Sequence, residues 1–399
     1  MIYERPKYKN QYENFIGGEW IAPSSGEYIE NITPVDGKLL KKIPRSNEKD
    51  VDLAIEAAKK GFEEFKHTSV TQRSALLNKI ADIVEANLET LAVAETLDNG
   101  KAVRETLNAD LPLFIDHFRY FASVIRAESG TISDLDENTI SQEIYEPYGV
   151  VAQIIPWNFP LLMAAWKLAP AIAAGNCVVL KPASSTPLSI LLFLDLIKDV
   201  LPKGVINVVN GAGGKIGKHL VTHRDVKKVA FTGETSTGQE IMRYATENII
   251  PSTLELGGKS PNVFFKSIMD ADDEFFDKAI EGLVLFAFNS GEVCTCPSRA
   301  LIEESIYEPF MKRVIERVKA IKLGNPLDTE NTMGAQNSFN QKEKIAKYLK
   351  IAKEDGAECL VGGDIYHSSV NPDGFYIEPT IYKGHNKMRI FQEEIFGPV

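Results

Sequence analysis

The sequence 149-GVVAQIIPWNFPLLMAAWKLAPAIAAGNCVVLK-181 decides the class of fold. A short apolar run at 149–155 is followed by turn residues, a longer apolar segment and a second short run at Cys177–Lys181. Short Val/Ile-rich runs that alternate with helical segments are typical of parallel strands joined by crossover helices. The same pattern predicts further strands of this sheet at Val205–Val209, Lys228–Phe231, Ser252–Leu256 and Asn262–Phe265.

Helices are expected on both sides of this sheet along the chain. In Asn47–Phe65 and Thr71–Asp98, apolar residues recur at three and four positions, as in helices that pack one face on a core. Residues 131–146 alternate like a strand. A second α/β unit is predicted from about Gly257. It contains a helix, a strand and a helix at Asp272–Asn289, Arg299–Glu303 and Tyr307–Ile321.

Composition excludes several classes of protein. The 399 residues suffice for two or three compact units, and 44% apolar with 25% charged residues is the balance of a globular protein. A net charge of -11 argues against a nucleic-acid binder, because phosphate contacts require clustered Lys and Arg. No secretion signal is recognisable, and the longest apolar stretch, Leu161–Gly175, is interrupted and too short to cross a bilayer. Four cysteines form no disulfide framework, so we expect a cytoplasmic protein with free thiols and no membrane association.

Three patterns imitate known motifs but lack a required residue. Gly211–Gly217 has isoleucine where the third glycine of a G-x-G-x-x-G loop belongs, so an ordinary strand-to-helix turn is favoured. The Gly-Lys-Ser at 258–260 imitates the end of a phosphate-binding loop, but the glycine required five positions earlier is Thr253. Cys294 and Cys296 have no second Cys/His pair at zinc-finger spacing, which argues against a metal site.

Cys294 is the principal candidate for a nucleophile. It follows Asn289-Ser-Gly291, a predicted helix end where main-chain N–H groups are free to bind an anion. A cysteine nucleophile needs a lowered pKa or a nearby base, together with donors for the oxyanion that forms on a carbonyl. Local sequence alone favours the alternative, a buried structural cysteine, because most free cysteines are inert packing residues.

Two further polar side chains stand at the ends of apolar strands. Glu255, within Leu254-Glu-Leu-Gly-Gly-Lys259, fits equally a base with a raised pKa or a partly exposed, satisfied acid. Asn158 follows an apolar strand that two prolines break, at the edge where open parallel sheets bind ligands. Its amide is suited to donate to an oxyanion, although local sequence favours a turn-stabilising asparagine.

The neighbouring strand ends supply candidate ligand contacts. Lys181 closes one strand, and the loop Phe231–Gly238, with two glycines, follows another. A lysine at this edge is placed to reach a ribose or a phosphate. The glycines allow the start of a helix to approach a pyrophosphate.

The order and spacing of these motifs resemble the aldehyde dehydrogenase superfamily over essentially the whole chain. The resemblance rests on Pro-Trp-Asn-Phe-Pro at 156–160, Lys-Pro at 181–182, Phe-Thr-Gly at 231–233 with Gly238, Leu-Glu-Leu-Gly-Gly-Lys at 254–259, the segment from Cys294 to Arg299, and Glu-Ile-Phe-Gly-Pro-Val at 394–399. Glu292 and Val293 stand where many members carry Gln and Cys or another residue. This variant looks most like bacterial enzymes that act on short aliphatic aldehydes such as acetaldehyde.

The resemblance implies a mechanism. Cys294 attacks the aldehyde, Asn158 and the Cys294 main-chain N–H hold the oxyanion, hydride passes to the nicotinamide, and a thioester remains. Glu255 then activates water, which releases the carboxylic acid.

The resemblance also implies an α/β fold with a variant Rossmann parallel sheet, an α/β catalytic domain and a small β bridging or oligomerisation arm. It assigns residues 1–130 and 147–256 to an NAD(P)-binding domain, 131–146 to the bridging strand and 257–399 to the catalytic domain. The implied cofactor is NAD, and NADP stays open because Ser184 stands where many NAD-preferring members carry Glu. The implied partners are a small-molecule aldehyde and further copies of the chain, in a dimer or tetramer.

The same resemblance assigns the cofactor contacts. Lys181 and Ser184 lie at the adenosine ribose, Gly233 and Gly238 shape the pyrophosphate loop, and Glu394 with Phe396 holds the nicotinamide ribose and ring. The remaining implied contacts are Ile155, Pro156, Trp157, Gly213, Gly217, Phe231, Thr232, Glu234 and Leu256.

Family members continue beyond the Gly-Pro-Val turn at 397–399, so we expect a C-terminally truncated chain with an incomplete catalytic domain. This expectation motivates one alternative, a catalytically inactive fragment or scaffold protein. A second alternative is a CoA-acylating aldehyde dehydrogenase. Glu255 argues against the second alternative, because a base that activates water favours hydrolysis.

Overall fold

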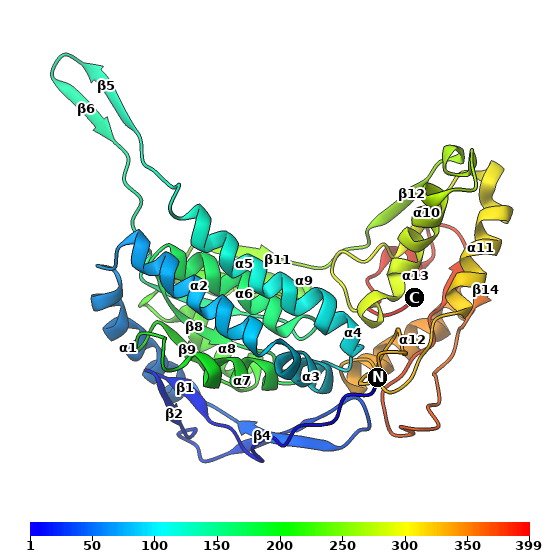
Figure 1. Ribbon diagram of the computed structural model, residues 1–399, viewed down its shortest axis with the longest axis horizontal. Coiled ribbons are helices and arrows are strands. Elements are labelled where there is room, and N and C mark those ends of the chain that lie inside the picture. Colours follow the sequence, from blue (N-terminus) through cyan, green and yellow to red (C-terminus); the bar gives the residue numbers. More distant parts are fainter.

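The core of the structure, a computed structural model that describes residues 1–399, is a seven-stranded sheet (Figure 1). Five neighbouring strands are parallel, and the antiparallel pair β1 and β2 extends the sheet beyond β9. In spatial order the strands are β11 (Ser252–Glu255), β10 (Val226–Thr232), β7 (Val150–Ile154), β8 (Cys177–Lys181), β9 (Ile206–Val208), β1 (Asn14–Ile16) and β2 (Glu19–Ile21).

Five of the six predicted parallel strands are confirmed in this sheet, and the sixth assignment is wrong. The segment at 262–265 forms β12 (Pro261–Phe264), which pairs with β13 (Arg299–Ile302) in a separate two-stranded sheet. The pattern of apolar residues marks a strand but carries no information on its partner. Residues 14–255 therefore supply the whole of the large sheet.

Helices cover both faces of the sheet and bury a core of 55 residues with it. One layer contains α1 (Glu48–Phe65), α8 (Gly213–Thr222) and α9 (Thr235–Ala245). The other contains α6 (Pro160–Ala173) and α7 (Leu188–Ile197), with α2 (Val70–Ala86), α3 (Leu88–Asn99) and α5 (Leu111–Val124) packed on them. Short elements connect α3 to α5, namely α4 (Val103–Glu105) and the π-helix η1 (Thr106–Asp110).

The predicted helix Thr71–Asp98 is in fact two helices, α2 and α3. Asn87 ends the first, with φ of -121° and ψ of 20°, and its side-chain Nδ2 donates to the main-chain oxygen of Ile83. Asparagine competes for main-chain hydrogen bonds in this way, which makes it suited to a helix boundary. The predicted helix Asn47–Phe65 is confirmed as α1, for which Asn47 and Asp50 form a capping box.

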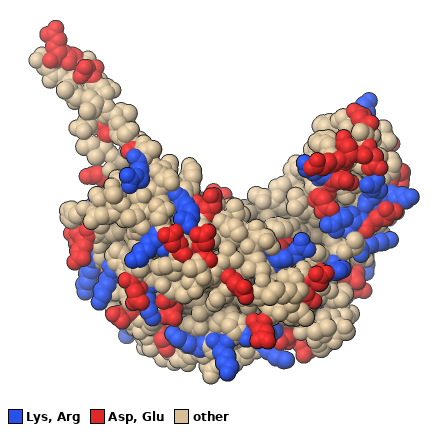
Figure 2. Space-filling model, in the orientation of Figure 1, with Lys and Arg blue, Asp and Glu red and all other residues tan.

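The alternating stretch at 131–146 folds as a hairpin of β5 (Ile132–Asp136) and β6 (Thr139–Gln142). Every residue of both strands is exposed. Figure 1 shows the hairpin projecting well clear of the other elements, and we call it the arm. In Figure 2 acidic side chains gather at its tip, whereas most of its length is uncharged.

A second group of elements follows residue 260 and stands on the other side of the structure from the arm (Figure 1). The predicted helix Asp272–Asn289 is shorter than expected, because it passes at Leu285 into a 3-10 segment that is broken at Phe288, Asn289 and Ser290. No helix is long and apolar enough to cross a bilayer. Besides β12 and β13, the group contains α10 (Glu274–Val284), α11 (Tyr307–Lys319), α12 (Phe339–Glu354), β14 (Glu358–Val361), β15 (Ile381–Lys383) and α13 (Arg389–Gln392).

Candidate active site

Residues 289–296, which we call the nucleophile loop, present Cys294 after the broken 3-10 segment. Three successive residues have positive φ, with 50° at Asn289, 55° at Ser290 and 74° at Gly291. A Cβ atom on Gly291 would lie 2.1 Å from the carbonyl carbon of Gly397, so only glycine permits this approach. The loop is therefore held tightly against the segment around Gly397.

The Cys294 thiol is half-buried, and burial raises its pKa, a direction that the nearby charges of Glu394 and Glu255 reinforce. The main-chain N–H groups of Thr295 and Cys294 act in the opposite direction. The Cys294 N–H donates to no carbonyl or side-chain oxygen of the protein. It is consequently free for an oxyanion that forms on a ligand attached to Sγ.

Asn158 lies directly beside the nucleophile loop. Its Nδ2 donates to the main-chain oxygen of Glu292 at 2.9 Å, and its own main-chain oxygen accepts from Asn289 Nδ2 at 3.1 Å. The side chain is buried, and its Nδ2 makes no second hydrogen bond to the protein. The interpretation of Asn158 as a turn-stabilising residue is wrong, because its amide bonds a loop 134 positions further along the chain.

Glu255, at the end of β11, is exposed, so it is not the buried acid that one of the two interpretations required. The buried ammonium group of Lys167 lies near it. Burial lowers the pKa of Lys167 to about 8, against the opposing effect of the Glu255 charge, and Nζ donates to Thr232 Oγ1 at 2.5 Å. Sequence reasoning missed Lys167 as a site residue. The available signal was a lysine inside the apolar stretch Leu161–Gly175.

Lys181 and Ser184 meet Gly213 at the carboxyl edge of β8 and β9. Burial lowers the pKa of Lys181 to about 8, and its Nζ bonds only the main-chain oxygen of Pro182, at 2.9 Å. Ser184 Oγ donates to the main-chain oxygen of Gly211 at 2.8 Å. A Cβ atom on Gly213 would lie 3.7 Å from Lys181 Cε, so these residues are neighbours. Gly217 lies one turn inside α8, where a Cβ atom would meet no other atom within 4 Å.

The loop after β10 leads directly into α9. Phe231 and Thr232 close β10, and Glu234 stands at the helix start without capping it through its side chain. A Cβ atom on Gly238 would lie 2.6 Å from Leu256 Cδ2, so this glycine lets α9 approach the residue after β11. The first main-chain N–H groups of α9 therefore have no capping side chain. Free N–H groups at the start of a helix stabilise a bound anion.

Glu394 and Phe396 approach this edge from the end of the chain. Glu394 Oε1 accepts from the Gly258 N–H at 3.2 Å. The Phe396 ring lies 5.2 Å from the Trp157 ring, nearly perpendicular to it. Ile155 and Pro156 precede Trp157, and the Ile155 N–H bonds the main-chain oxygen of Lys181 at 3.2 Å.

These donors and acceptors suit a dinucleotide. Lys181 is a buried cation with no carboxylate partner, and the starts of α8 and α9 lack side-chain caps. Both features favour a bound pyrophosphate, while the carboxylate of Glu394 is suited to ribose hydroxyl groups.

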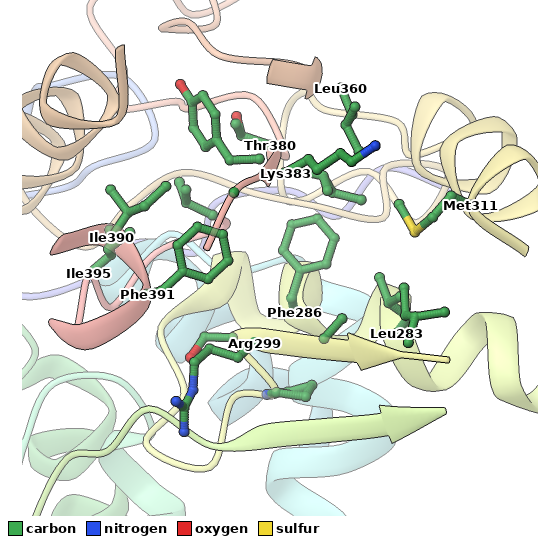
Figure 3. Close-up of a pocket in the computed structure, with 18 of the residues that line it drawn as sticks. Leu283, Phe286, Arg299, Met311, Leu360, Thr380, Lys383, Ile390, Phe391 and Ile395 are labelled. Carbon is green, nitrogen blue, oxygen red and sulfur yellow. The ribbon is translucent and has the colours of Figure 1, made fainter. Parts of the chain in front are cut away.

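The pocket drawn in Figure 3 is a separate feature of the second group of elements. Its volume is about 140 Å³, and the side chains that point into it are mainly apolar, among them Phe286, Met311 and Phe391. None of Cys294, Glu255 and Asn158 lines it. Cys296, whose Sγ donates to the Phe286 main-chain oxygen at 3.7 Å, is a buried packing residue.

Comparison with known proteins gives consistent results. The model of the aldehyde dehydrogenase family matches residues 20–399. A long-chain-aldehyde dehydrogenase of Acinetobacter sp is 63% identical over 98% of this chain and 78% of its own length. Acetaldehyde dehydrogenase 2 of Cupriavidus necator is 59% identical, with 98% and 78% covered. A solved indole-3-acetaldehyde dehydrogenase of P. syringae, in complex with NAD+, has a TM-score of 0.93 at 39% identity, with 98% and 79% covered.

Proposed function

The chain is an enzyme of the aldehyde dehydrogenase family, and we propose that it oxidises a short aliphatic aldehyde to the carboxylic acid with NAD+, through a covalent intermediate on Cys294. The hydrogen bond from Asn158 Nδ2 to the Glu292 main-chain oxygen gives this proposal its strongest support. It holds a side-chain amide beside the loop that carries the thiol. A nucleophile and an oxyanion donor are thus brought together from two distant segments.

In the first step, Cys294 Sγ attacks the carbonyl carbon of the aldehyde, and the thiol proton passes to solvent water. The negative charge that develops on the carbonyl oxygen is held by the second hydrogen of Asn158 Nδ2 and by the Cys294 N–H. NAD+ supplies the hydride acceptor when bound. When the hydride leaves, the carbon–oxygen double bond re-forms and the acyl group stays on Sγ as a thioester.

In the second step, Glu255 accepts a proton from a water molecule, whose oxygen attacks the thioester carbon. The carbon–sulfur bond breaks, the acid leaves, and Sγ takes up the proton that Glu255 accepted from water. The exposure of Glu255 gives water access to it.

For the cofactor, we propose that residues 1–130 and 147–256 bind NAD and that residues 257–399 contribute the nucleophile. Lys181 and the start of α9 then bind the ribose and pyrophosphate, and Glu394 binds the nicotinamide ribose. Ser184 is neutral and already bonded to Gly211, so no carboxylate from this position repels a 2′-phosphate. We therefore expect NAD to be preferred and NADP to be used to a measurable degree.

The arm supports a further part of the proposal, association into a homo-oligomer. Its large apolar side chains are open to solvent, with Ile132 69%, Leu135 66% and Ile140 68% exposed. Its base lines a cavity of about 1110 Å³ that reaches Trp166 and Glu255. Apolar surface of this kind is characteristic of a contact between subunits.

The deciding experiment follows NADH formation by the purified chain with acetaldehyde and with longer aldehydes. We expect turnover that requires Cys294 and yields the free acid, with a slower reaction when NADP replaces NAD. A folded, NAD-binding chain that forms no NADH would overturn the proposal and favour an inactive scaffold. Acyl-CoA in place of free acid, when CoA is supplied, would instead favour the CoA-acylating reaction.

A further inference from the structure

A group of buried acids lies within and behind the nucleophile loop, and its carboxyl groups have no role in the chemistry described above. Glu95, Glu105, Asp110 and Glu292 are at most 9% exposed. Lys101 is the one buried cation among them, and its Nζ lies 2.6 Å from Asp110 Oδ2. One carboxyl oxygen of each acid has no hydrogen-bond partner. Four buried acids beside one cation form an expensive arrangement that the packing of a core does not require.

Glu105, the last residue of α4, contacts the nucleophile loop directly. Its Oε1 accepts the main-chain N–H of Asn289 at 3.0 Å. Asn289 has φ of 50°, a conformation that is strained for a residue other than glycine and needs support from its surroundings. The carboxyl of Glu105 supplies a hydrogen bond that supports it.

In this conformation, the Asn289 side chain connects the nucleophile loop to the loop that carries Asn158. Its Nδ2 donates to the main-chain oxygens of both Asn158 and Glu292, at 3.1 Å in each case. The Glu292 oxygen also accepts from Asn158 Nδ2. A chain of hydrogen bonds therefore links Glu105 to the side-chain amide of Asn158, the donor to the oxyanion. It passes through Asn289 and the main-chain oxygen of Glu292.

The same group of acids also holds the loop that carries Asn158. Glu95 Oε2 accepts the main-chain N–H of Leu161 at 3.1 Å. The Lys101 ammonium group lies 3.9 Å from the centre of the Phe159 ring. Both loops are thus fixed from one buried cluster.

We propose that Glu105 is a positioning residue for aldehyde oxidation: its buried carboxyl holds Asn289 in the conformation that fixes the amide of Asn158 against the nucleophile loop. This inference rests on the proposed function, because it assumes that Cys294 and Asn158 act on the aldehyde. Glu105 itself contacts neither the substrate nor the reacting atoms. Its effect is on the geometry of the oxyanion donors, to which reaction rates are very sensitive.

The protonation state of Glu105 gives this role a measurable signature. Burial raises the pKa of Glu105 to about 8, and the charge of Asp110 adds to the effect, whereas the Asn289 N–H, Lys101 and Arg104 oppose it. Burial raises the pKa of Glu95 to about 8 and that of Glu292 well above its usual value.

The folded chain therefore favours the neutral acid at Glu105. This contribution to stability is complete below about pH 4.5 and is lost as the pH rises through about 8. Above that pH, ionised carboxyls repel one another around Lys101 and disturb the two loops.

The test uses Glu105→Gln, Glu105→Leu and a matched control, Asp98→Asn. Glutamine keeps an oxygen that accepts the Asn289 N–H and cannot ionise, whereas leucine fills the space without an acceptor. Asp98 is also a fully buried acid, but its carboxyl group bonds Lys41 and the Leu188 N–H and makes no hydrogen bond to either loop. The measurements are the rate of the first NADH turnover, the KM for the aldehyde, NAD binding and the pH profile of kcat.

For Glu105→Leu we expect the first-turnover rate to fall by about 10- to 100-fold, with KM and NAD binding within about threefold of wild type. Glu105→Gln should restore the rate near neutral pH and should lose less activity above about pH 8 than wild type does. Asp98→Asn should keep the alkaline decline of wild type. A wild-type first-turnover rate in folded Glu105→Leu, or equal alkaline declines in wild type and Glu105→Gln, would overturn the inference. An inactive wild type would instead overturn the proposed function itself.

Discussion

The raised pKa of Cys294 means that this thiol is mostly protonated before an aldehyde arrives. Replacement of Cys294 by alanine removes the only atom able to form the covalent intermediate, so we expect kcat to fall at least about 1,000-fold. NAD binding, followed by fluorescence titration, should stay within about twofold. Cys296→Ala is the matched control, since its thiol packs against Phe286 and should be dispensable. Substantial turnover by the Cys294 variant would contradict the mechanism.

Glu255 belongs only to the second step of the proposed reaction. In Glu255→Gln the amide cannot accept a proton from water, so hydrolysis of the thioester should slow by about 100- to 10,000-fold. The first turnover should remain fast, which produces a burst of NADH followed by a slow phase in a rapid-mixing experiment. Glu394→Gln is a useful comparison, because its carboxylate is assigned to the cofactor rather than to water. If both phases slow equally in Glu255→Gln, Glu255 has another role.

Ser184 provides a test of cofactor choice. A glutamate at this position places a negative charge near Lys181, where a 2′-phosphate would approach. For Ser184→Glu we expect the ratio of kcat/KM with NADP to that with NAD to fall by about 10- to 100-fold. Ser184→Gln has the same size without the charge and should change the ratio much less. Equal effects of the two substitutions would show that size, and not charge, selects the cofactor.

Single residues also show the limits of inference from sequence. Local sequence did not favour catalytic roles for Cys294 and Asn158, but both stand in motifs that resemble the aldehyde dehydrogenase family, so these roles could be predicted before the fold was known. The roles of Lys167 and Glu105 could not be predicted in this way. Their importance depends on burial and on contacts with Thr232 and Asn289, which lie 65 and 184 positions away.

Among the elements, the 3-10 segment before Cys294 determines where the thiol lies. In Gly291→Ala, the new methyl group meets Gly397, and the backbone at φ of 74° becomes strained, so we expect a loss of about 1–3 kcal/mol in unfolding free energy together with loss of activity. Gly356→Ala is the matched control, because Gly356 has φ of 79° and no neighbour within 4 Å. Denaturant unfolding and NADH assays would compare the two. Full activity in Gly291→Ala would show that the loop tolerates displacement.

The elements themselves were largely predictable, whereas their partners were not. The bounds of Cys177–Lys181 could be predicted to the residue, since a short apolar run bounded by turn residues gives a clear signal. The separate pairing of β12 with β13, and the addition of β1 and β2 to the large sheet, depend on tertiary contacts that no local pattern encodes.

For the whole molecule, the arm determines how copies of the chain are expected to associate. Ile132 and Ile140 share one face of the hairpin, since Ile132 pairs with Gln142 and Asp134 with Ile140. Lysine at both positions should weaken self-association by at least about tenfold, measured by sedimentation, and leave the melting temperature of the monomer unchanged. Lysine at Ser133 and Ser141, on the opposite face, is the control. Equal effects of the two pairs, or a monomeric wild type, would refute the assigned face.

The edge of the large sheet has a consequence for the order in which the molecule folds. Phe15 in β1 pairs with Val208 in β9, and the Gly17 N–H bonds the side chain of Asn207, 190 positions away. Contacts of such sequence separation close slowly, because the chain loses the entropy of a long loop before it gains them. While the ribosome is still adding the residues between, β1 and β2 have no strand to join. The strands β1 and β2 can therefore join the sheet only after nearly all of its parallel strands have formed. Until then their apolar side chains remain exposed to solvent.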